Sequence, residues 1–168
     1  EAAENALERA QLFEDIQSAN EHLERLAITD GLTALYNHRH FRDRLEEEFE
    51  RAKRYNIPLT CLIFDIDNFK KFNDQHGHLV GDSILREIAR RTLFCIRNSD
   101  FVARYGGEEF VIILPQTNAQ GAPSEAERLL DASREKPFDA VDGVHGALLL
   151  FDEVQTGNGR LGVPFAAQ

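Results

Sequence analysis

Apolar residues recur at spacings of three and four over residues 1 to about 28, and this pattern predicts one long helix. The apolar seam consists of Leu12, Ile16, Ala19, Leu23 and Leu26. Two interpretations stay open for it. The seam packs on the helix's own domain, or it pairs two copies in a parallel coiled coil that transmits a signal from an upstream region. We therefore divide the chain into a signalling helix, 1–28, and a second unit, 29–168.

The second unit alternates between helix and strand patterns. Turn-forming residues over 29–37 end the first helix, and helical spacing resumes over 38–54. The later segments are expected to be a buried strand (58–67), a helix (79–96), two strands (101–105 and 108–114), a helix (122–135) and a last strand (146–151). This β-α-β-β-α-β order predicts an α+β fold of the ferredoxin-like type. Its first strand and its hairpin strands would lie in one antiparallel-rich sheet, flanked by helices and extended by the N-terminal helix.

Composition narrows the classes of partner. The formal net charge of −10 opposes non-specific binding to nucleic acid or to an anionic membrane surface, but a divalent cation can still bridge acidic side chains to a nucleotide. We found no apolar stretch of membrane-spanning length and no signal-peptide pattern, so a cytoplasmic setting without direct membrane contact is expected. The first residue is Glu, which fits a fragment of a longer protein. Cys61 and Cys95 lie in apolar runs and are expected to be buried free thiols.

Carboxylates lie at the end of one predicted strand and at the start of another. The segment RYGGEEF (104–110) places Glu108 and Glu109 beside two glycines, where their like charges repel unless a positive charge lies nearby. In FDIDNFKKFND, strand alternation sends Asp65 and Asp67 to one face and Ile66 to the other. If the two strands are neighbours, Asp65 and Glu108 converge. Two carboxylates with a backbone carbonyl form an oxygen-rich site suited to Mg²⁺.

Two lysines follow this acidic segment. Lys70 and Lys71 are half of the four lysines in the chain. Cations beside a metal site suit a triphosphate, and the glycines would permit positive φ and leave space for a nucleotide. The simpler alternatives are an Asp that caps a turn or helix and a Gly-Gly pair that only closes a hairpin. Both features together, on predicted neighbouring strands, favour a metal-dependent nucleotide site.

Three segments resemble one family. RYGGEEF followed by VIILP, FDIDNFKKFNDQHGHLVGD, and LAITDGLTALYNHRHF resemble the GGDEF domain of diguanylate cyclases, in its GGEEF form, over about residues 24 to 120. The resemblance implies a palm-type fold similar to that of adenylyl cyclases and some polymerases. It also implies an enzyme that joins two GTP molecules into cyclic di-GMP with Mg²⁺ or Mn²⁺. Because one domain holds one GTP, it implies a homodimer, and an upstream sensor domain is expected.

The resemblance assigns the metal and phosphate contacts. Asp65, Glu108 and the Ile66 carbonyl would hold the metal, and Glu108 would also help to deprotonate the ribose 3′-hydroxyl. Lys70 and the backbone around Asn68 and Phe69 would contact the triphosphate and steady the transition state. Glu109 would have a supporting role.

The same resemblance assigns the base contacts. Asn73 and Asp82 would read the guanine edge, because an amide and a carboxylate complement its donors and acceptors. His78 would line the nucleoside pocket, and the alternative is a hydrogen-bonded structural histidine near a glycine turn.

A second motif precedes the hairpin. Arg97 and Asp100 match the family's inhibitory RxxD motif, which binds product away from the catalytic face. Arg97 can donate a bidentate pair to phosphate or guanine, and Asp100 can accept from guanine. The alternative is an ordinary surface ion pair.

The C-terminal part departs from the family. After about residue 120 the expected Ser-Ile-Gly-Val strand and the last helix with its phosphate-binding Lys and Arg are missing, so 121–168 is interpreted as a divergent tail or a fusion. Residues 145–168 instead resemble a short segment of class III pyridoxal-phosphate aminotransferases, but the rest of that enzyme is absent, so no cofactor role is carried to Asp152. The run at 146–151 can still supply the sixth strand.

Three functions are compatible with these sequence features to different degrees. The first is a diguanylate cyclase that is product-inhibited through the RxxD site. The second is a catalytically impaired domain that binds GTP or cyclic di-GMP as a regulatory module. The third, a polymerase-like palm acting on nucleic acid, is disfavoured by the negative charge and the lack of a basic stripe.

Overall fold

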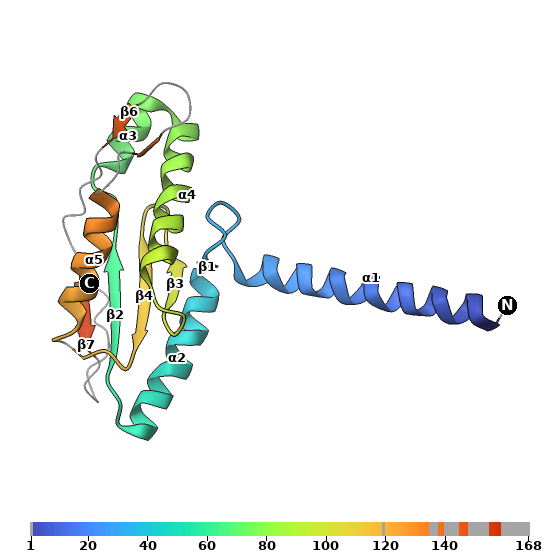
Figure 1. The fold of residues 1–168 in the computed structure, drawn as a ribbon. Helices are drawn as coiled ribbons and strands as arrows, with labels where there is room; N and C mark the ends of the chain where they lie inside the picture. Colours follow the sequence, from blue (N-terminus) through green and yellow to red (C-terminus); the bar gives the residue numbers. More distant parts are fainter. Residues whose placement is uncertain (1, 119, 135–137, 140–144, 148–154, 159–168) are drawn as a thin grey trace.

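The computed structural model describes residues 2–118, 120–134, 138–139, 145–147 and 155–158 of the chain. Figure 1 shows a long helix, α1 (Ala2–Ile28), that projects away from a twisted sheet flanked by helices. Four further helices surround the sheet: α2 (His38–Tyr55), α3 (Phe69–His76), α4 (His78–Cys95) and α5 (Ala122–Arg134). Among the described residues, no helix is both long and apolar enough to cross a membrane.

The main sheet has five strands in the order β1-β3-β4-β2-β7. They are β1 (Tyr36–Asn37), β2 (Leu59–Phe64), β3 (Phe101–Arg104), β4 (Phe110–Pro115) and β7 (Gln155–Asn158). β4 pairs antiparallel with both β2 and β3, β7 pairs antiparallel with β2, and β1 pairs parallel with β3. The predicted α+β fold is confirmed: β2, α4, β3, β4, α5 and β7 occur in the order β-α-β-β-α-β, with α3 inserted before α4 and the β5-β6 pair before β7.

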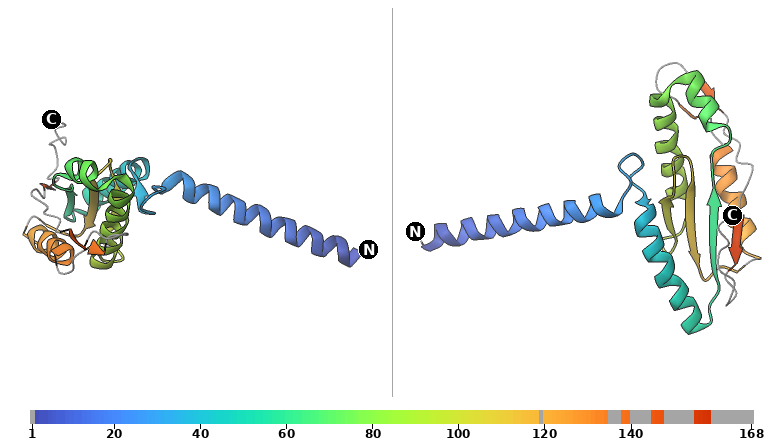
Figure 2. Two further views of the ribbon diagram at one scale, coloured as in Figure 1. Left: turned by 90° about the horizontal axis from the view of Figure 1, so that it is seen from above. Right: turned by 180° about the vertical axis from the view of Figure 1, so that it is seen from behind.

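Both faces of the sheet are covered, and this explains the continuous apolar run of β4. On one face Phe110 and Ile112 pack with residues of α4 and α5. On the other face Val111 and Ile113 pack with Phe41 of α2. Successive strand residues point to opposite faces, so a strand buried on both sides is apolar at every position. Figure 2 shows these helices on the two sides of the sheet.

The strand predicted over 146–151 is described only at residues 146 and 147, and these do not join the main sheet. His145–Ala147 forms β6, which pairs with β5 (Phe138–Asp139) in a separate two-stranded sheet, and residues 148–151 lie outside the described residues. The strand beside β2 is the polar segment Gln155–Asn158 instead. An edge strand of a sheet tolerates polar residues, so apolar content did not identify it.

The structure differs from the sequence prediction in three smaller respects. The strand predicted over 58–67 ends at Phe64, so the DID segment lies in the turn that follows it. The helix α3 and the short strand β1 were not predicted, because each is too short to show a clear period. Both cysteines are free. Cys61 is buried, which raises its pKa to about 12, whereas Cys95 is only half-buried.

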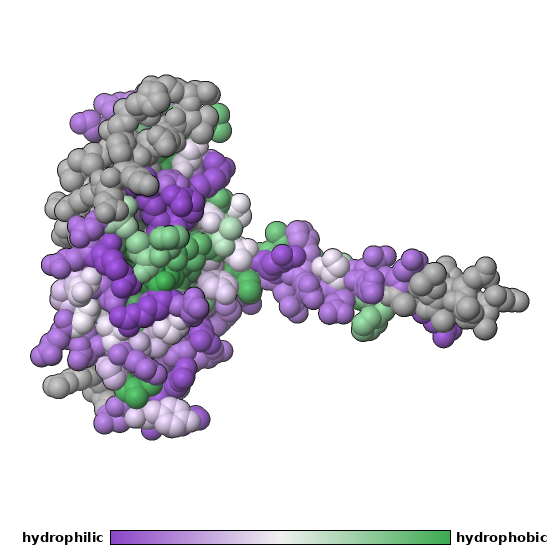
Figure 3. Space-filling view, in the orientation of Figure 1, coloured by the Kyte–Doolittle hydropathy of each residue, from purple (hydrophilic) through white to green (hydrophobic). Residues whose placement is uncertain are grey.

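The apolar seam of α1 is exposed. Leu12, Ile16, Leu23 and Leu26 keep between 53% and 62% of their surface accessible, and Figure 3 shows the projecting helix surrounded by open space. The interpretation in which the seam packs on its own domain therefore does not hold. Pairing with a second helix stays a prediction.

Candidate active site and anion site

Two acidic segments meet at one end of the sheet. Phe64, the last residue of β2, pairs with Phe110, the first residue of β4. Asp65 comes directly after Phe64, and Glu108 comes two residues before Phe110. Because β2 and β4 are antiparallel neighbours, both carboxylates lie at the same end of the sheet, beside the glycine bend.

The electrostatics of Glu108 reflect this meeting. Burial raises its pKa, and the negative charges of Asp65 and Glu109 raise it further. Asp65 and Glu108 are thus close enough for their charges to repel, and a cation would relieve that repulsion. The Ile66 carbonyl accepts a hydrogen bond from the Phe69 N–H at 3.3 Å, which leaves one of its two lone pairs for another partner.

The residues fit a cation that arrives with its substrate. Within the described ranges, no three His, Cys, Asp or Glu side chains gather to form a metal site. The predicted set has only two carboxylates and one carbonyl. Mg²⁺ is commonly held by one or two carboxylates while phosphates and waters complete its octahedron, so a two-carboxylate set suits a nucleotide-bound metal.

The start of α3 lies next to this end of the sheet. Asn68 adopts the left-handed conformation (φ 56°) just before the helix begins. The Phe69 side chain is buried in the core, so only its backbone is available to a ligand. Lys70 and Lys71 are exposed on the first turn. This placement leaves two ammonium groups in solvent near the end of the sheet that carries Asp65 and Glu108.

The glycine bend lacks the positive φ that was predicted for it, and the predicted space for a nucleotide stays a prediction. Among the described glycines only Gly77 has a positive φ, so neither Gly106 nor Gly107 is there for that reason. At Gly106 a Cβ would lie 2.3 Å from Glu109 Oε2, so any larger residue would displace the carboxylate of the exposed Glu109 side chain. At Gly107 nothing lies within 4 Å of a Cβ, which leaves open space beside the bend.

Arg104 forms hydrogen bonds that hold the glycine bend in place, and this role was not predicted from the sequence. Its Nε and Nη2 donate to the Gly107 carbonyl at 3.2 and 2.6 Å, and its Nη1 donates to Asp30 Oδ1 at 3.1 Å. Burial alone would raise the pKa of Asp30, but hydrogen bonds from Thr33 and Arg104 lower it overall. The loop that follows α1 is thereby tied to the glycine bend. The only sequence hint was a charged residue at a strand end.

A buried amide oxygen marks the predicted base pocket. Asn73 Oδ1 is buried and has no hydrogen-bond partner. It lies against Gly81, where a Cβ would come within 1.9 Å of it. Asp82 follows on α4 and is half-buried, and His78 is exposed at the start of that helix. A buried carbonyl without a partner is rare in folded proteins, and it is suited to accept N–H donors from a ligand.

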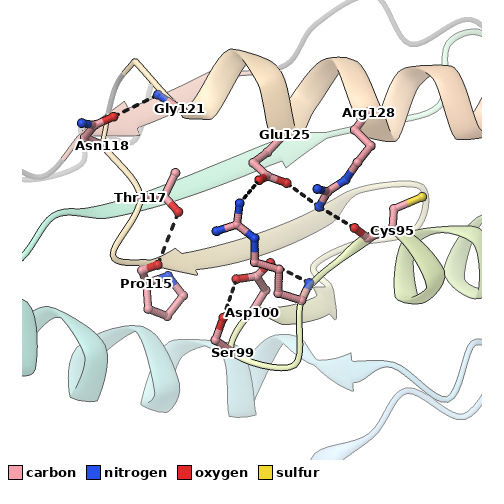
Figure 4. Close-up of polar contacts among 10 residues, drawn as sticks. Cys95, Ser99, Asp100, Pro115, Thr117, Asn118, Gly121, Glu125 and Arg128 are labelled. Carbon is pink, nitrogen blue, oxygen red and sulfur yellow. Dashed lines mark hydrogen bonds and ion pairs between the residues drawn. The ribbon is translucent and has the colours of Figure 1, made fainter.

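The RxxD turn lies against α5. Asp100 Oδ2 accepts from the Arg97 backbone N–H at 2.9 Å, and the Arg97 side chain donates to Glu125 Oε1 at 2.5 Å. Arg128 forms an ion pair with Glu125 Oε2 and donates to the Cys95 carbonyl at 2.5 Å. Figure 4 shows Glu125 and Arg128 reaching from α5 toward the turn. Sequence reasoning missed both, because nothing local connects α5 to the RxxD motif.

Comparison with known proteins identifies the family. The model of the diguanylate cyclase GGDEF domain matches residues 27–144. This chain belongs to the GGDEF domain family. The match extends beyond residue 120, where the resemblance in sequence motifs fades, and residues 145–168 lie outside it.

Curated relatives are longer than this GGDEF domain. The response regulator PleD of Caulobacter vibrioides is 39% identical over 137 residues, which cover 82% of this chain and 30% of PleD. The diguanylate cyclase DgcP of Pseudomonas aeruginosa is 41% identical over 136 residues, which cover 79% of this chain and 20% of DgcP. The chain thus spans less than a third of the length of either relative.

Solved structures share the fold. The coiled coil and GGDEF domain of DgcB from Caulobacter crescentus, in complex with c-di-GMP, matches with a TM-score of 0.79 and 28% identity over 94% of this chain and 82% of that one. The diguanylate cyclase SiaD from Pseudomonas aeruginosa, in complex with its activator SiaC, matches with a TM-score of 0.78 and 34% identity over 95% and 60%.

The aminotransferase resemblance at 145–168 stays untested. Asp152 and most of that segment lie outside the described residues, and the described parts, His145–Ala147 and Gln155–Asn158, are short strands.

Proposed function

We propose that this GGDEF domain is the output domain of a diguanylate cyclase, which condenses two GTP molecules into cyclic di-GMP with Mg²⁺ or Mn²⁺. The observation that carries the proposal is that Asp65 and Glu108 meet at the paired ends of β2 and β4, where burial and the charges of Asp65 and Glu109 raise the pKa of Glu108. Such a cluster is suited to a divalent cation and a polyphosphate. Because GTP is a cytosolic nucleotide, we place the domain in the cytoplasm, downstream of a sensor.

Each site residue has a task in this proposal. Asp65, Glu108 and the Ile66 carbonyl hold the metal ion, which neutralises phosphate charge when it is bound. Glu108 also accepts the proton of the ribose 3′-hydroxyl as that oxygen attacks the α-phosphate of the facing GTP, and pyrophosphate leaves. Lys70 and the backbone at Asn68 and Phe69 contact the triphosphate.

Guanine binds between α3 and α4. Asn73 Oδ1, which is buried without a partner, accepts from the N1–H or N2–H₂ edge. Asp82 accepts a second donor from that edge, and the exposed His78 lines the nucleoside pocket. This pairing of an amide with a carboxylate complements guanine and leaves adenine, which lacks those two donors, poorly matched.

Ring closure needs two domains, and α1 supplies the means to bring them together. We expect Leu23→Asp to shift the protein from dimer to monomer, because the charge would be buried in the paired seam. At a fixed protein concentration, turnover should fall by about tenfold or more as the effective concentration of the second half-site is lost. Light scattering and GTP turnover measure the two effects. Asn20→Asp adds the same charge to α1 outside the seam, and a dimeric, inactive Leu23→Asp protein would contradict the expectation.

The Arg97 and Asp100 turn is proposed as a site for cyclic di-GMP, where bound product inhibits the enzyme. Arg128 joins it, because its head group lies on the same carboxylate as that of Arg97. The second candidate function is a regulatory module that binds GTP or cyclic di-GMP without turnover. It is favoured by the 145–168 tail, which lies outside the family match.

One assay separates the two candidates. Purified chain is incubated with GTP and Mg²⁺, and the products are separated by chromatography. Appearance of cyclic di-GMP supports the cyclase. If no cyclic product forms while calorimetry still measures GTP or cyclic di-GMP binding, the module is the correct function. If neither nucleotide binds, both candidates are wrong.

A further inference from the structure

One carboxylate bridges the two arginines of the RxxD face. Glu125 Oε1 accepts from Arg97, Glu125 Oε2 forms an ion pair with Arg128, and only 10% of the Glu125 side chain is exposed. The arginine side chains are 57% and 46% exposed. A phosphodiester group presents the same pattern to arginines, namely two oxygens that share one negative charge. Glu125 thus presents to the two arginines the same charge pattern as a phosphate group.

We propose that Glu125 is a built-in competitor for this anion site. Its carboxylate occupies the guanidinium donors that a cyclic dinucleotide needs, so the chain binds its product weakly and escapes product inhibition until product is abundant. The inference rests on the proposed product site at Arg97 and Asp100, and it adds the residue that sets the affinity of that site.

The charges around the turn support this assignment. Arg97 and Arg128 carry two positive charges, and Glu125 and Asp100 carry two negative ones, so the face attracts an anion less than its arginines alone would. The Asp100 oxygens are already engaged by the Arg97 N–H and by Ser99 Oγ. Asp100 is therefore held in the turn, and Glu125 is the carboxylate that stands between the arginine heads.

Binding of a phosphate is hindered whichever way Glu125 responds. If the carboxylate stays, the phosphate meets a like charge at close range. If it withdraws, a largely buried carboxylate loses two ion-pair partners. Glu125 Oε1 accepts one N–H of Arg97 Nη2, and Arg128 Nη2 lies between Glu125 Oε2 and the Cys95 carbonyl, so fewer guanidinium N–H groups are left for a bidentate contact with a phosphate.

The test compares Glu125→Gln with wild type and with Glu127→Gln, in the full chain. Glu127 is exposed on the same helix, so its replacement makes the same change in net charge. Calorimetric titration with cyclic di-GMP is expected to show about tenfold tighter binding for Glu125→Gln, which corresponds to about 1.4 kcal/mol. Glu127→Gln should bind like wild type, and the affinity for GTP should not change in either variant. Arg97→Ala in the Glu125→Gln background should abolish the gain.

The measurements distinguish a failure of the Glu125 inference from a failure of the proposed cyclase function. Equal or weaker binding by a folded Glu125→Gln protein overturns the inference, and so does an equal gain in Glu127→Gln. Glu125→Ala repeats the comparison if the Gln variant fails to fold. If no variant binds cyclic di-GMP while wild type still converts GTP, the inference and the product site fail but the cyclase stands. If Glu125→Gln binds tightly in a chain without turnover, the inference holds for the regulatory module.

Discussion

Glu108→Gln is expected to lower the rate of cyclic di-GMP formation on the order of a thousandfold, the upper end of what one lost transition-state group costs. The amide keeps the shape of the side chain but removes a metal ligand and the proton acceptor. The fold should not suffer, because burial and the charges of Asp65 and Glu109 already disfavour the ionised form of Glu108. Turnover is measured by chromatography of products, and stability by thermal unfolding without metal.

The stability of the metal-free protein should depend on pH through the same carboxyl group. A raised pKa at Glu108 means that the folded state binds its proton more tightly than the unfolded chain, so the ionised group destabilises the metal-free fold. This destabilisation is absent below the ordinary Glu value of 4.5 and grows as pH rises through the raised pKa. Glu108→Gln should therefore equal wild type in acid and unfold at a higher temperature at neutral pH.

Glu46→Gln provides the control for this prediction, since it removes the same charge from an exposed position on α2. It should change neither turnover nor the pH profile. A Glu108→Gln protein that keeps wild-type turnover would show that the metal and proton roles belong to other residues.

The main fold was predictable because its signals are local and repeated. The apolar runs of β2 and β4 are buried on both faces, and α4 keeps Ile84, Leu85 and Ile88 in the core. Period and length identify such elements in sequence. The meeting of Asp65 with the glycine bend followed from the strand order, because antiparallel neighbours place those two ends together.

The parts that were missed depend on contacts between distant segments. No periodicity favours the polar edge strand Gln155–Asn158, which exists through its pairing with β2. Arg104 acquires its role only when the loop holding Asp30 lies beside the bend. Glu125 likewise meets Arg97 across 28 residues. Gly106 could be identified as special from sequence, but its close approach to the Glu109 carboxylate required coordinates.

Asn73→Ala is expected to weaken GTP binding by up to about a hundredfold without loss of stability. A lost hydrogen bond to a charged or well-placed partner, together with the donor left unpaired, accounts for about 1.5–3 kcal/mol. In the free protein the substitution removes a buried Oδ1 that has no partner, a defect of about 1–3 kcal/mol that offsets the lost packing. Binding is measured by calorimetry and stability by thermal unfolding. Selectivity for GTP over inosine triphosphate, which lacks the guanine amine, should shrink.

Gly81→Ala should reproduce the binding defect through geometry alone. Its Cβ would lie 1.9 Å from Asn73 Oδ1 and 3.1 Å from Phe69 Cζ, so the amide must move away from the pocket. The KM for GTP should rise about tenfold, as expected for the displacement of one positioning group. Gly31→Ala is the matched control, because nothing lies within 4 Å of a Cβ there. If Gly81→Ala and Asn73→Ala both keep wild-type GTP affinity and selectivity, guanine does not bind between α3 and α4, and the unpartnered oxygen of Asn73 must have another cause.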